Sequence, residues 1–245
     1  MKNNSSLQPE GFELETNTVW SFKNRGKWAT HDAKYRGNWS PYVPRNVILR
    51  YSSPGDLVLD QFVGGGTTAI ESKLTGRSFI GYDINPNAVT LTRNKCAFHS
   101  DTELIFSVDE GDARYLKLEN ESVDLICTHP PYANIIKYSE DIEGDLSLLN
   151  TNSFLEEIYL VAKEAYRVLK PNKYCAIMMG DTRKNGMVQP LAFETMQKFK
   201  SAGFDIKEII IKEQHNCTAT GFWKTNSIKH NFLLLAHEYL FIFKK

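Results

Sequence analysis

Two short motifs carry residues whose types and spacing suit ligand binding and chemistry. The first is Asp60-Gln-Phe-Val-Gly-Gly-Gly-Thr-Thr68, which lies between a predicted strand and a predicted helix. Glycines let the backbone turn tightly and approach a ligand, and the N-terminus of the following helix offers free N–H groups. No lysine follows the glycines, which argues against the phosphate-binding loop of an NTPase.

Two acidic residues follow the next predicted strands. Asp83 comes nineteen residues after Gly64, at a strand end, where a carboxylate can bind both hydroxyls of a ribose. Asp112 can accept a hydrogen bond from an adenine amine, or it can be a turn residue before Arg114. Together with the glycines, Asp83 indicates a nucleoside cofactor.

The second motif is Thr128-His-Pro-Pro-Tyr132, directly after another predicted strand. Two prolines cannot continue a sheet ladder, so the chain must leave the strand here with its carbonyls fixed and exposed. Rigid carbonyl acceptors beside an aromatic ring can hold a planar base by stacking and can accept hydrogen bonds from its exocyclic amine. The motif therefore predicts a site for a nucleic-acid base.

Alternating strands and helices must position these motifs. Apolar runs predict strands over 56–60, 78–82, 104–108, 123–127 and 174–179, and helical spacing predicts helices over 67–75, 87–98, 153–169 and 191–202. Ser153 is the expected cap of the third helix. The runs 206–212 and 233–243 are expected to pair as antiparallel strands, with a long loop over 214–231. The pattern predicts an α/β fold with a mostly parallel sheet, an antiparallel C-terminal hairpin and helices on both faces.

On these residues the chain resembles a DNA amino-methyltransferase that uses S-adenosylmethionine. The first motif is similar to the family's cofactor loop, DPFxGxGTT, and the second to its catalytic loop, (D/N/S)PP(Y/F/W). The continuation Ala133-Asn134 is similar to the TSPPYAN of cytosine-N4 members, and Trp39-Ser40-Pro41 resembles a short motif that touches the cofactor. The motif order is gamma-like. The resemblance covers roughly residues 20–180 and implies a Rossmann-like methyltransferase fold.

The resemblance also implies roles for the matching residues. The catalytic residues would be His129, Pro130, Pro131 and Tyr132, with Tyr132 stacking on a base flipped out of the duplex. His129 and the Pro130 carbonyl would bind its amine. The cofactor would be S-adenosylmethionine, with no metal needed, and the cofactor-binding residues would be Trp39, Pro41, Asp60, Phe62, Gly64, Gly66, Thr67, Thr68, Asp83, Ile84, Asp112, Ala113 and Thr128.

Three positions depart from the family pattern. Gln61 stands where proline is usual, and Gly65 stands where serine or another small residue is common. His129 replaces the Asp, Asn or Ser that accepts a hydrogen bond from the target amine. Neutral histidine can accept through one ring nitrogen, whereas imidazolium cannot. We therefore expect activity to fall as the pH drops through the ionisation of His129, and a flat profile from pH 5.5 to 8 to contradict that role.

Charge is unevenly distributed along a chain that is neutral overall. Residues 19–50 hold seven Lys and Arg against Asp32 alone, which suits a polyanion-binding face. We expect one methyltransferase domain over 1–245, with DNA-recognition elements in 19–50, 133–152 and 213–232 instead of a separate domain. The residues expected to contact DNA are Arg25, Lys27, Arg36, Lys137, Gln214, His215 and Asn216, whereas Glu140, Asp141, Glu143 and Asp145 are expected to face solvent.

Composition argues against other classes of protein. No run approaches the roughly 18 apolar residues of a membrane-spanning helix, and the first residues are not signal-like. Cys96, Cys127, Cys175 and Cys217 are scattered singly, which indicates neither a disulfide framework nor a zinc site, and Cys127 is expected to be a core thiol. We expect a cytoplasmic protein of prokaryotic or viral type, with no membrane or metal partner.

The leading hypothesis is a site-specific methyltransferase that acts on an exocyclic amine of double-stranded DNA. The THPPYAN context slightly favours cytosine N4 over adenine N6. The family implies a restriction-modification context, with a cognate restriction endonuclease as the expected partner. Two alternatives stay open. One is an RNA base methyltransferase, and the other is a protein that binds S-adenosylmethionine and nucleic acid without catalysis, in which His129 marks lost activity.

Overall fold

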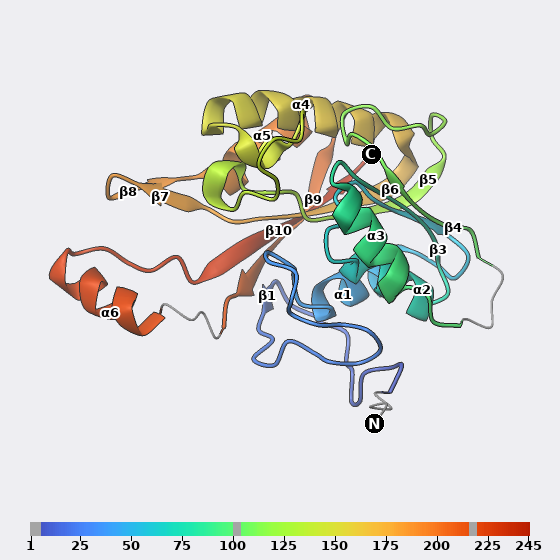
Figure 1. Cartoon of the computed structure of the whole chain (residues 1–245), viewed down its shortest axis with the longest axis horizontal. Helices are drawn as coiled ribbons and strands as arrows, with labels where there is room; N and C mark the ends of the chain where they lie inside the picture. Colours follow the sequence, from blue (N-terminus) through green and yellow to red (C-terminus); the bar gives the residue numbers. More distant parts are fainter. Residues whose placement is uncertain (1–5, 100–103, 216–219) are drawn as a thin grey trace.

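An eight-stranded sheet forms the centre of the molecule in the computed structural model, which describes residues 6–99, 104–215 and 220–245 (Figure 1). The strand order is β1-β9-β10-β6-β5-β2-β3-β4. The strands are β1 (Val19–Trp20), β2 (Leu57–Asp60), β3 (Ser78–Asp83), β4 (Phe106–Glu110), β5 (Val123–Thr128), β6 (Leu169–Met179), β9 (Asp205–Glu213) and β10 (His237–Lys244).

The central strands are parallel, as the sequence predicts. β4, β3, β2, β5 and β6 pair in parallel, and β10 pairs antiparallel with both β6 and β9. The predicted mostly parallel sheet with an antiparallel C-terminal pair is therefore confirmed. β2 lies between β3 and β5, so the strand order reverses there. Ligands of open α/β sheets bind outside the carboxyl ends of the strands at such a switch point.

Helices cover both faces of the sheet (Figure 1). α4 (Thr151–Val168) and α5 (Leu191–Ser201) pack on one face, where Phe154 and Phe199 are fully buried. α1 (Tyr42–Tyr51), α2 (Thr67–Leu74) and α3 (Pro86–Lys95) pack on the other. Cys127 is a fully buried core thiol between the layers, as expected. Among the helices of the described ranges, none is long and apolar enough to cross a membrane.

Several elements differ from the prediction. Asn150, not Ser153, caps α4, because the Asn150 side chain accepts hydrogen bonds from the N–H groups of Asn152 and Ser153. The expected loop over 214–231 is wrong in part, since α6 (Thr220–Lys229) lies within it. α1, the short strand β1, the 3-10 helices η1 (Ala133–Ile135) and η2 (Leu146–Leu148), and the hairpin of β7 (Thr182–Lys184) and β8 (Met187–Gln189) had no counterpart in the prediction.

Both described edges of the sheet are short or charged. β1 has two residues, and β4 at the opposite edge ends in the exposed Asp109 and Glu110. Short edges and edge charges discourage pairing with another chain.

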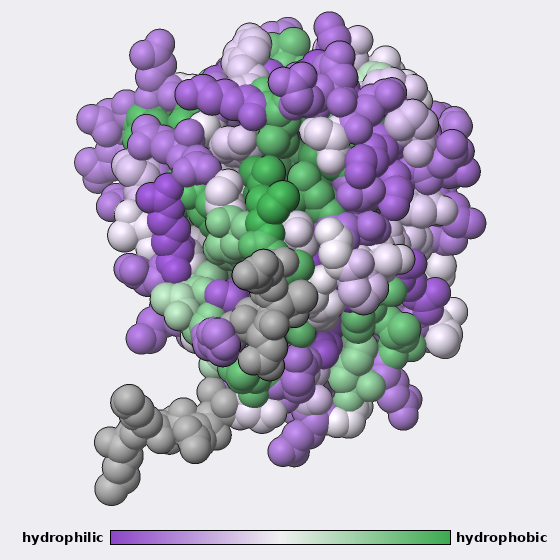
Figure 2. Space-filling model, turned by 90° about the vertical axis from the view of Figure 1, so that its right-hand side faces the viewer, coloured by the Kyte–Doolittle hydropathy of each residue, from purple (hydrophilic) through white to green (hydrophobic). Residues whose placement is uncertain are grey.

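Figure 2 shows the side of the molecule that lies on the right of Figure 1. A band of hydrophobic surface there is flanked by hydrophilic surface.

A buried carboxylate fastens the chain before α1 to the domain. Glu71 in α2 is fully buried, and its Oε1 accepts a hydrogen bond of 2.7 Å from the Trp28 indole. His31 Nε2 lies 2.7 Å from the same oxygen, and Arg45 Nη1 donates to Oε2 at 2.8 Å. Trp28 and His31 belong to the segment that leads to Trp39. The cluster therefore fixes the position of that segment.

The Glu71→Ala substitution will destabilise the protein. It leaves the buried groups of Trp28, His31 and Arg45 without their acceptor, and breaking a buried ion pair costs about 3–5 kcal/mol. Chemical denaturation will measure this loss in the free energy of unfolding. The exposed Glu140→Ala is the matched control, with an expected change within about 0.5 kcal/mol. A loss for Glu71→Ala as small as that of the control would contradict the assignment.

Candidate functional site

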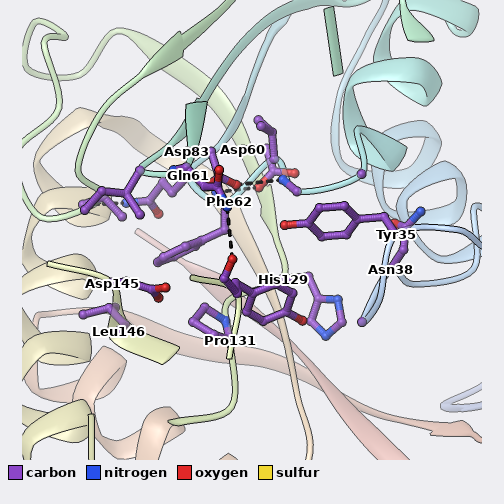
Figure 3. A pocket seen from close by; sticks show the side chains of 18 of the residues that line it. Tyr35, Asn38, Asp60, Gln61, Phe62, Asp83, His129, Pro131, Asp145 and Leu146 are labelled. Atoms are coloured by element: carbon purple, nitrogen blue, oxygen red, sulfur yellow. Dashed lines mark hydrogen bonds between the residues drawn. The ribbon is translucent and has the colours of Figure 1, made fainter. Parts of the chain in front are cut away.

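A cavity lies at the carboxyl ends of β2, β3, β4 and β5 (Figure 3). Asp60, Gln61, Phe62 and Asp83 approach it from the strand ends, and His129 and Pro131 lie opposite. Both sequence motifs therefore meet at one cavity. The residues that line it are Tyr35, Gly37, Asn38, Trp39, Asp60, Gln61, Phe62, Val63, Gly64, Gly65, Asp83, Ile84, Asn85, Gly111, Asp112, Ala113, His129, Pro131, Tyr138, Gly144, Asp145 and Leu146.

The glycine loop after β2 needs its glycines for two reasons. Gly64 and Gly66 have φ of 46° and 78°, in the left-handed region that L side chains rarely adopt. At Gly65, an added Cβ would lie 2.9 Å from the Asn38 amide and from Tyr35 Cβ. The segment around Asn38 thus packs directly on the loop and closes one side of the cavity.

Asp83 presents its carboxylate at the end of β3. Its Oδ2 accepts a hydrogen bond from Gly64 N at 2.9 Å, and its Oδ1 accepts one from Asn85 N at 3.0 Å. Burial raises the pKa of Asp83 to about 6, although the two backbone hydrogen bonds oppose that rise. Each oxygen keeps a further lone pair. Asp83 can therefore accept two more hydrogen bonds from a ligand in the cavity.

Asp60 joins the two motifs. It is 3% exposed, and its Oδ1 accepts hydrogen bonds from Thr128 Oγ1 at 2.7 Å and from Phe62 N at 3.0 Å. Burial raises the pKa of Asp60 to about 6, against the effect of these hydrogen bonds. Thr128 ends β5, directly before His129. The contact thus ties the loop after β2 to the loop after β5.

The wall of the cavity near β4 combines a bound carboxylate with a free acceptor. The Arg114 guanidinium holds Asp112, with Nε donating to Oδ1 at 2.9 Å. Gln61 Nε2 donates to the Ala113 carbonyl at 3.1 Å, while the buried Gln61 Oε1 has no hydrogen-bond partner among the described residues. Gln61, which departs from the family pattern, therefore has one acceptor atom that can bind a ligand.

Some expected cofactor-binding residues do not line the cavity. Pro41, Gly66, Thr67, Thr68 and Thr128 are absent from its lining, and the three threonines are at most 2% exposed. Thr67 Oγ1 donates to Asn38 Oδ1, and Thr128 bonds to Asp60. Thr67 and Thr128 therefore form hydrogen bonds that hold Asn38 and Asp60, two residues that do line the cavity.

The cavity also includes residues that sequence analysis missed. Tyr35 and Asn38 lie just before the Trp39-Ser40-Pro41 motif, and their nearness to it could have revealed them. Asp145 was expected to face solvent, but it is 7% exposed, because Ser147 N donates to its Oδ1 at 2.8 Å. Tyr138 and Leu146 lie in the stretch that we had associated with DNA alone.

A second cavity lies beside the first and shares Gly37, His129 and Tyr138 with it. At Gly37, where φ is 76°, an added Cβ would lie 1.9 Å from the Tyr138 hydroxyl, so any other residue would be strained and would have to displace Tyr138. His129 thus stands between two adjoining spaces. The second cavity is lined by Gly37, His129, Pro130, Tyr132, Ile135, Ile136, Tyr138, Gly180, Asp181, Thr182, Gln214, Leu235, His237 and Glu238.

His129 is held by rings and by a line of polar groups. Its ring stacks on Trp39, with centroids 5.2 Å apart and planes 23° apart. His129 Nε2 lies 2.7 Å from the Tyr132 hydroxyl, which donates to Glu238 Oε1 at 2.8 Å. Lys212 Nζ donates to Glu238 Oε2 at 2.9 Å. Nothing in the sequence near Glu238 or Lys212 pointed to this contact with the Thr128–Tyr132 motif.

Burial decides the charge of His129. It lowers the pKa of His129 to about 4, and the nearby Glu238 carboxylate opposes this only in part. Neutral imidazole is therefore the form present above about pH 5. Our expectation that ionisation of His129 would shape the profile between pH 5.5 and 8 needs correction. As far as His129 is concerned, a flat profile in that range agrees with a neutral, hydrogen-bonding histidine.

The residues expected to contact DNA differ in exposure. Lys27, Arg36 and Lys137 are exposed. Arg25 Nη1 donates to the Asn38 carbonyl at 2.7 Å, and the other two guanidinium nitrogens are buried. His215 Nε2 lies 2.9 Å from Ser21 Oγ, Gln214 lines the second cavity, and Asn216 lies outside the described residues.

Comparisons with known proteins agree with the motifs. The sequence model of a family described as DNA methylase matches residues 1–94 and 123–245. The Type II methyltransferase M1.MboII of Moraxella bovis is 54% identical over 80 residues, which cover 29% of this chain and 29% of that protein. A tRNA (guanine(10)-N2)-dimethyltransferase of Methanothermobacter thermautotrophicus is 39% identical over 99 residues, or 40% of this chain. Those residues cover 29% of that protein, so each match spans under a third of the relative.

The fold has solved counterparts. A crystal structure of a SAM-dependent methyltransferase from Methanosarcina mazei superposes with a TM-score of 0.57. The match covers 81% of this chain and 96% of that one, at 17% sequence identity. A likeness at this identity shows a shared fold and carries no statement about substrate.

Direct titration will test the environment of His129. Because burial disfavours the imidazolium, the His129 ring will titrate with a midpoint near pH 4, well below the ordinary value near 6.5. Proton NMR of the histidine ring signals will measure the midpoint, with the His129→Gln variant identifying the signal. A midpoint between 6 and 7 would show that the ring is solvated, contrary to the packing described.

Proposed function

Since the chain belongs to the DNA methylase family, we propose that it transfers a methyl group from S-adenosylmethionine to an exocyclic amine of a base in double-stranded DNA. The observation that carries the proposal is the pair of adjoining cavities that meet at His129. One cavity contains the glycine loop and Asp83, and the other contains Pro130 and Tyr132. A methyl donor in the first would face an amine in the second.

The residues around the first cavity fit the cofactor. Asp83 has two oxygens with free lone pairs for the ribose hydroxyls, and Gln61 Oε1 is a buried acceptor without a partner. Phe62 and Ile84 supply apolar wall for the adenine ring, and Asp112 lies near enough to line the same space. When bound, S-adenosylmethionine supplies an electrophilic methyl group on its sulfonium, so the protein needs no covalent nucleophile.

The residues around the second cavity fit a flipped base. A base must leave the stack before its amine can be reached. Tyr132 offers an aromatic face there, and its hydroxyl is tied to His129 and Glu238, which fixes the position of the outer end of the ring. The Pro130 carbonyl and His129 would hold the amine hydrogens. Placing the two reactants in line accounts for most of the expected rate.

We take cytosine N4 as the first choice of target, with adenine N6 as the other outcome. The choice rests on the Thr128–Asn134 context alone. Expected partners follow from the family: duplex DNA and a cognate restriction endonuclease in a restriction-modification setting. An RNA base is the second candidate substrate, because one similar protein is named for guanine N2 of tRNA, which is also an exocyclic amine.

A projecting arm beside the second cavity is suited to bind DNA. We define the arm as the β7–β8 hairpin and residues 220–236, which project from the sheet on the same side (Figure 1). The two parts touch, since Arg183 donates to the Leu233 carbonyl at 2.9 Å and covers the Phe232 ring. Neither part contains an acidic residue, and Lys224 and Lys229 are exposed. Basic, acid-free surface of this kind binds phosphates.

Incubation with radiolabelled S-adenosylmethionine tests the function. Duplex DNA of mixed sequence should gain label, and mass analysis of the digested nucleosides will tell N4-methylcytosine from N6-methyladenine. Transfer RNA, offered in parallel, should stay unlabelled. His129→Leu, which keeps the bulk but removes the acceptor, is the inactive control. Label in tRNA and none in DNA would replace our proposal with the RNA alternative.

The Asp83→Asn substitution will weaken cofactor binding. The amide gives up one acceptor position, and a hydrogen bond to a charged group contributes about 1.5–3 kcal/mol. We expect the dissociation constant for S-adenosylmethionine to rise about 10- to 100-fold by calorimetry, with the exposed Asp141→Asn as the unaffected control. Wild-type affinity will also fall as the pH drops through about 6, because protonation removes acceptor capacity. Unchanged affinity in Asp83→Asn would refute the ribose assignment.

The arm can be tested through the salt dependence of DNA binding. The Lys224→Ala/Lys229→Ala double variant will bind duplex DNA more weakly, and the slope of log K against log salt will become shallower by about 1 to 2. Fluorescence anisotropy at several salt concentrations measures both quantities. Lys163→Ala, exposed on α4 away from the arm, should leave the slope unchanged. Equal slopes for all three proteins would remove the arm from the DNA interface.

A further inference from the structure

Four polar groups from three parts of the chain form one line that ends at His129. Lys212 lies on β9, Glu238 on β10, and Tyr132 directly after the two prolines. The contacts are Lys212 Nζ to Glu238 Oε2 at 2.9 Å, Tyr132 hydroxyl to Glu238 Oε1 at 2.8 Å, and His129 Nε2 to the Tyr132 hydroxyl at 2.7 Å. Glu238 is 7% exposed. We call this line of contacts the relay.

The chemistry of these groups leaves a single arrangement of hydrogens. An ammonium only donates and a carboxylate only accepts, so Lys212 and Tyr132 both donate to Glu238. Tyr132 has one hydroxyl hydrogen, and the hydroxyl uses it in the hydrogen bond that it donates to Glu238. Toward His129, the Tyr132 oxygen can then only accept, and His129 Nε2 must carry a hydrogen to fill that contact.

The charges required by this arrangement agree with their surroundings. Burial raises the pKa of Glu238, but the Lys212 ammonium and the hydrogen bonds from Lys212 and Tyr132 oppose it, and the pKa lies below its ordinary value. Glu238 is therefore a carboxylate. Because burial keeps His129 neutral, its single ring hydrogen is fully used at Nε2, and Nδ1 keeps a lone pair.

That lone pair is open to a ligand. Within residues 6–99, 104–215 and 220–245, no hydrogen bond to His129 Nδ1 is found, and the atom is not among the fully buried unpaired ones. The ring lines both cavities. A neutral histidine in the other tautomer would present an N–H at this atom and could not accept a hydrogen from an amine.

We propose that Glu238, supported by Lys212, is a positioning residue that acts through Tyr132 to hold His129 as the Nε2–H tautomer, with Nδ1 as the acceptor for the target amine. The role of Nδ1 rests on the proposed function, whereas the tautomer is a property of the protein alone. The relay explains how histidine can stand where the family uses Asp, Asn or Ser. A neutral histidine has two ring nitrogens, and only one of them can accept a hydrogen bond. Glu238, through Tyr132, determines which of the two it is.

The Glu238→Gln substitution reverses the relay with almost no change of shape. Lys212 cannot accept a hydrogen bond, so the new amide will turn its oxygen toward Lys212 and its NH₂ toward Tyr132. The Tyr132 oxygen then accepts from the amide, and its hydroxyl hydrogen turns to His129 Nε2. Nε2 must become the acceptor, which moves the ring hydrogen to Nδ1.

Nitrogen-15 NMR of protein labelled at its six histidines reads the tautomer without cofactor or DNA. In the wild type, His129 should show a protonated Nε2 and an unprotonated Nδ1, and in Glu238→Gln the two should exchange places. Glu208→Gln on β9 is the matched control and should keep the wild-type pattern. Tyr132→Phe/Glu238→Gln, which cuts the relay, should show the same pattern as Tyr132→Phe.

Wild-type protein with its hydrogen on Nδ1 overturns the inference, whether or not the variants fold. So does a folded Glu238→Gln that keeps the hydrogen on Nε2. Kinetics then test the role of the tautomer. Glu238→Gln should lower kcat by up to about 10⁴-fold, as expected of a wrong histidine tautomer, while KM for S-adenosylmethionine stays unchanged. Exchanged tautomers with normal kcat would refute the amine contact but leave the relay intact. No transfer by the wild type would refute only the proposed function.

Discussion

The hydrogen bond from Thr128 to the buried Asp60 carboxylate is the contact on which the site depends. It joins the ends of two adjacent parallel strands, β2 and β5, at the point where the strand order reverses. A carboxylate is costly to bury, and the raised pKa of Asp60 records that cost. The hydrogen bond holds the glycine loop and the His129 loop at a fixed separation. Two ligands, one bound by each loop, must then lie next to each other.

The second constraint is the packing of other side chains around His129. Trp39 stacks on the ring from the segment that Glu71 fastens, while Tyr132 and Glu238 hold one edge. Burial makes the ring neutral, and the relay decides which nitrogen accepts. A histidine exposed to water would have neither property fixed. The departure from the family motif is thus compensated by contacts that only the folded chain brings together.

Sequence reasoning succeeded where the cause is local. The strands over 56–60 and 123–127 are short apolar runs, and the turn residues after them placed the site at the correct edge of the sheet. It failed where the residue pattern does not reveal burial, helix formation or pairing in the folded chain. Asp145 carries a charge in an acidic stretch, yet the hydrogen bonds of the neighbouring turn bury it. In α6, Phe222 and Ile228 stay exposed, so no apolar stripe marked the helix. Glu238 lies more than a hundred residues from Tyr132.

We propose that the two cavities bring a methyl donor to a base of duplex DNA. Expression in a bacterial host without its own DNA methylation, followed by single-molecule kinetic sequencing of the genome, tests this most directly. We predict one sequence motif modified at nearly every copy, on cytosine N4 or adenine N6, and unmodified DNA when His129→Leu is expressed. An unmodified genome in cells that contain folded wild-type protein able to bind S-adenosylmethionine would contradict the account.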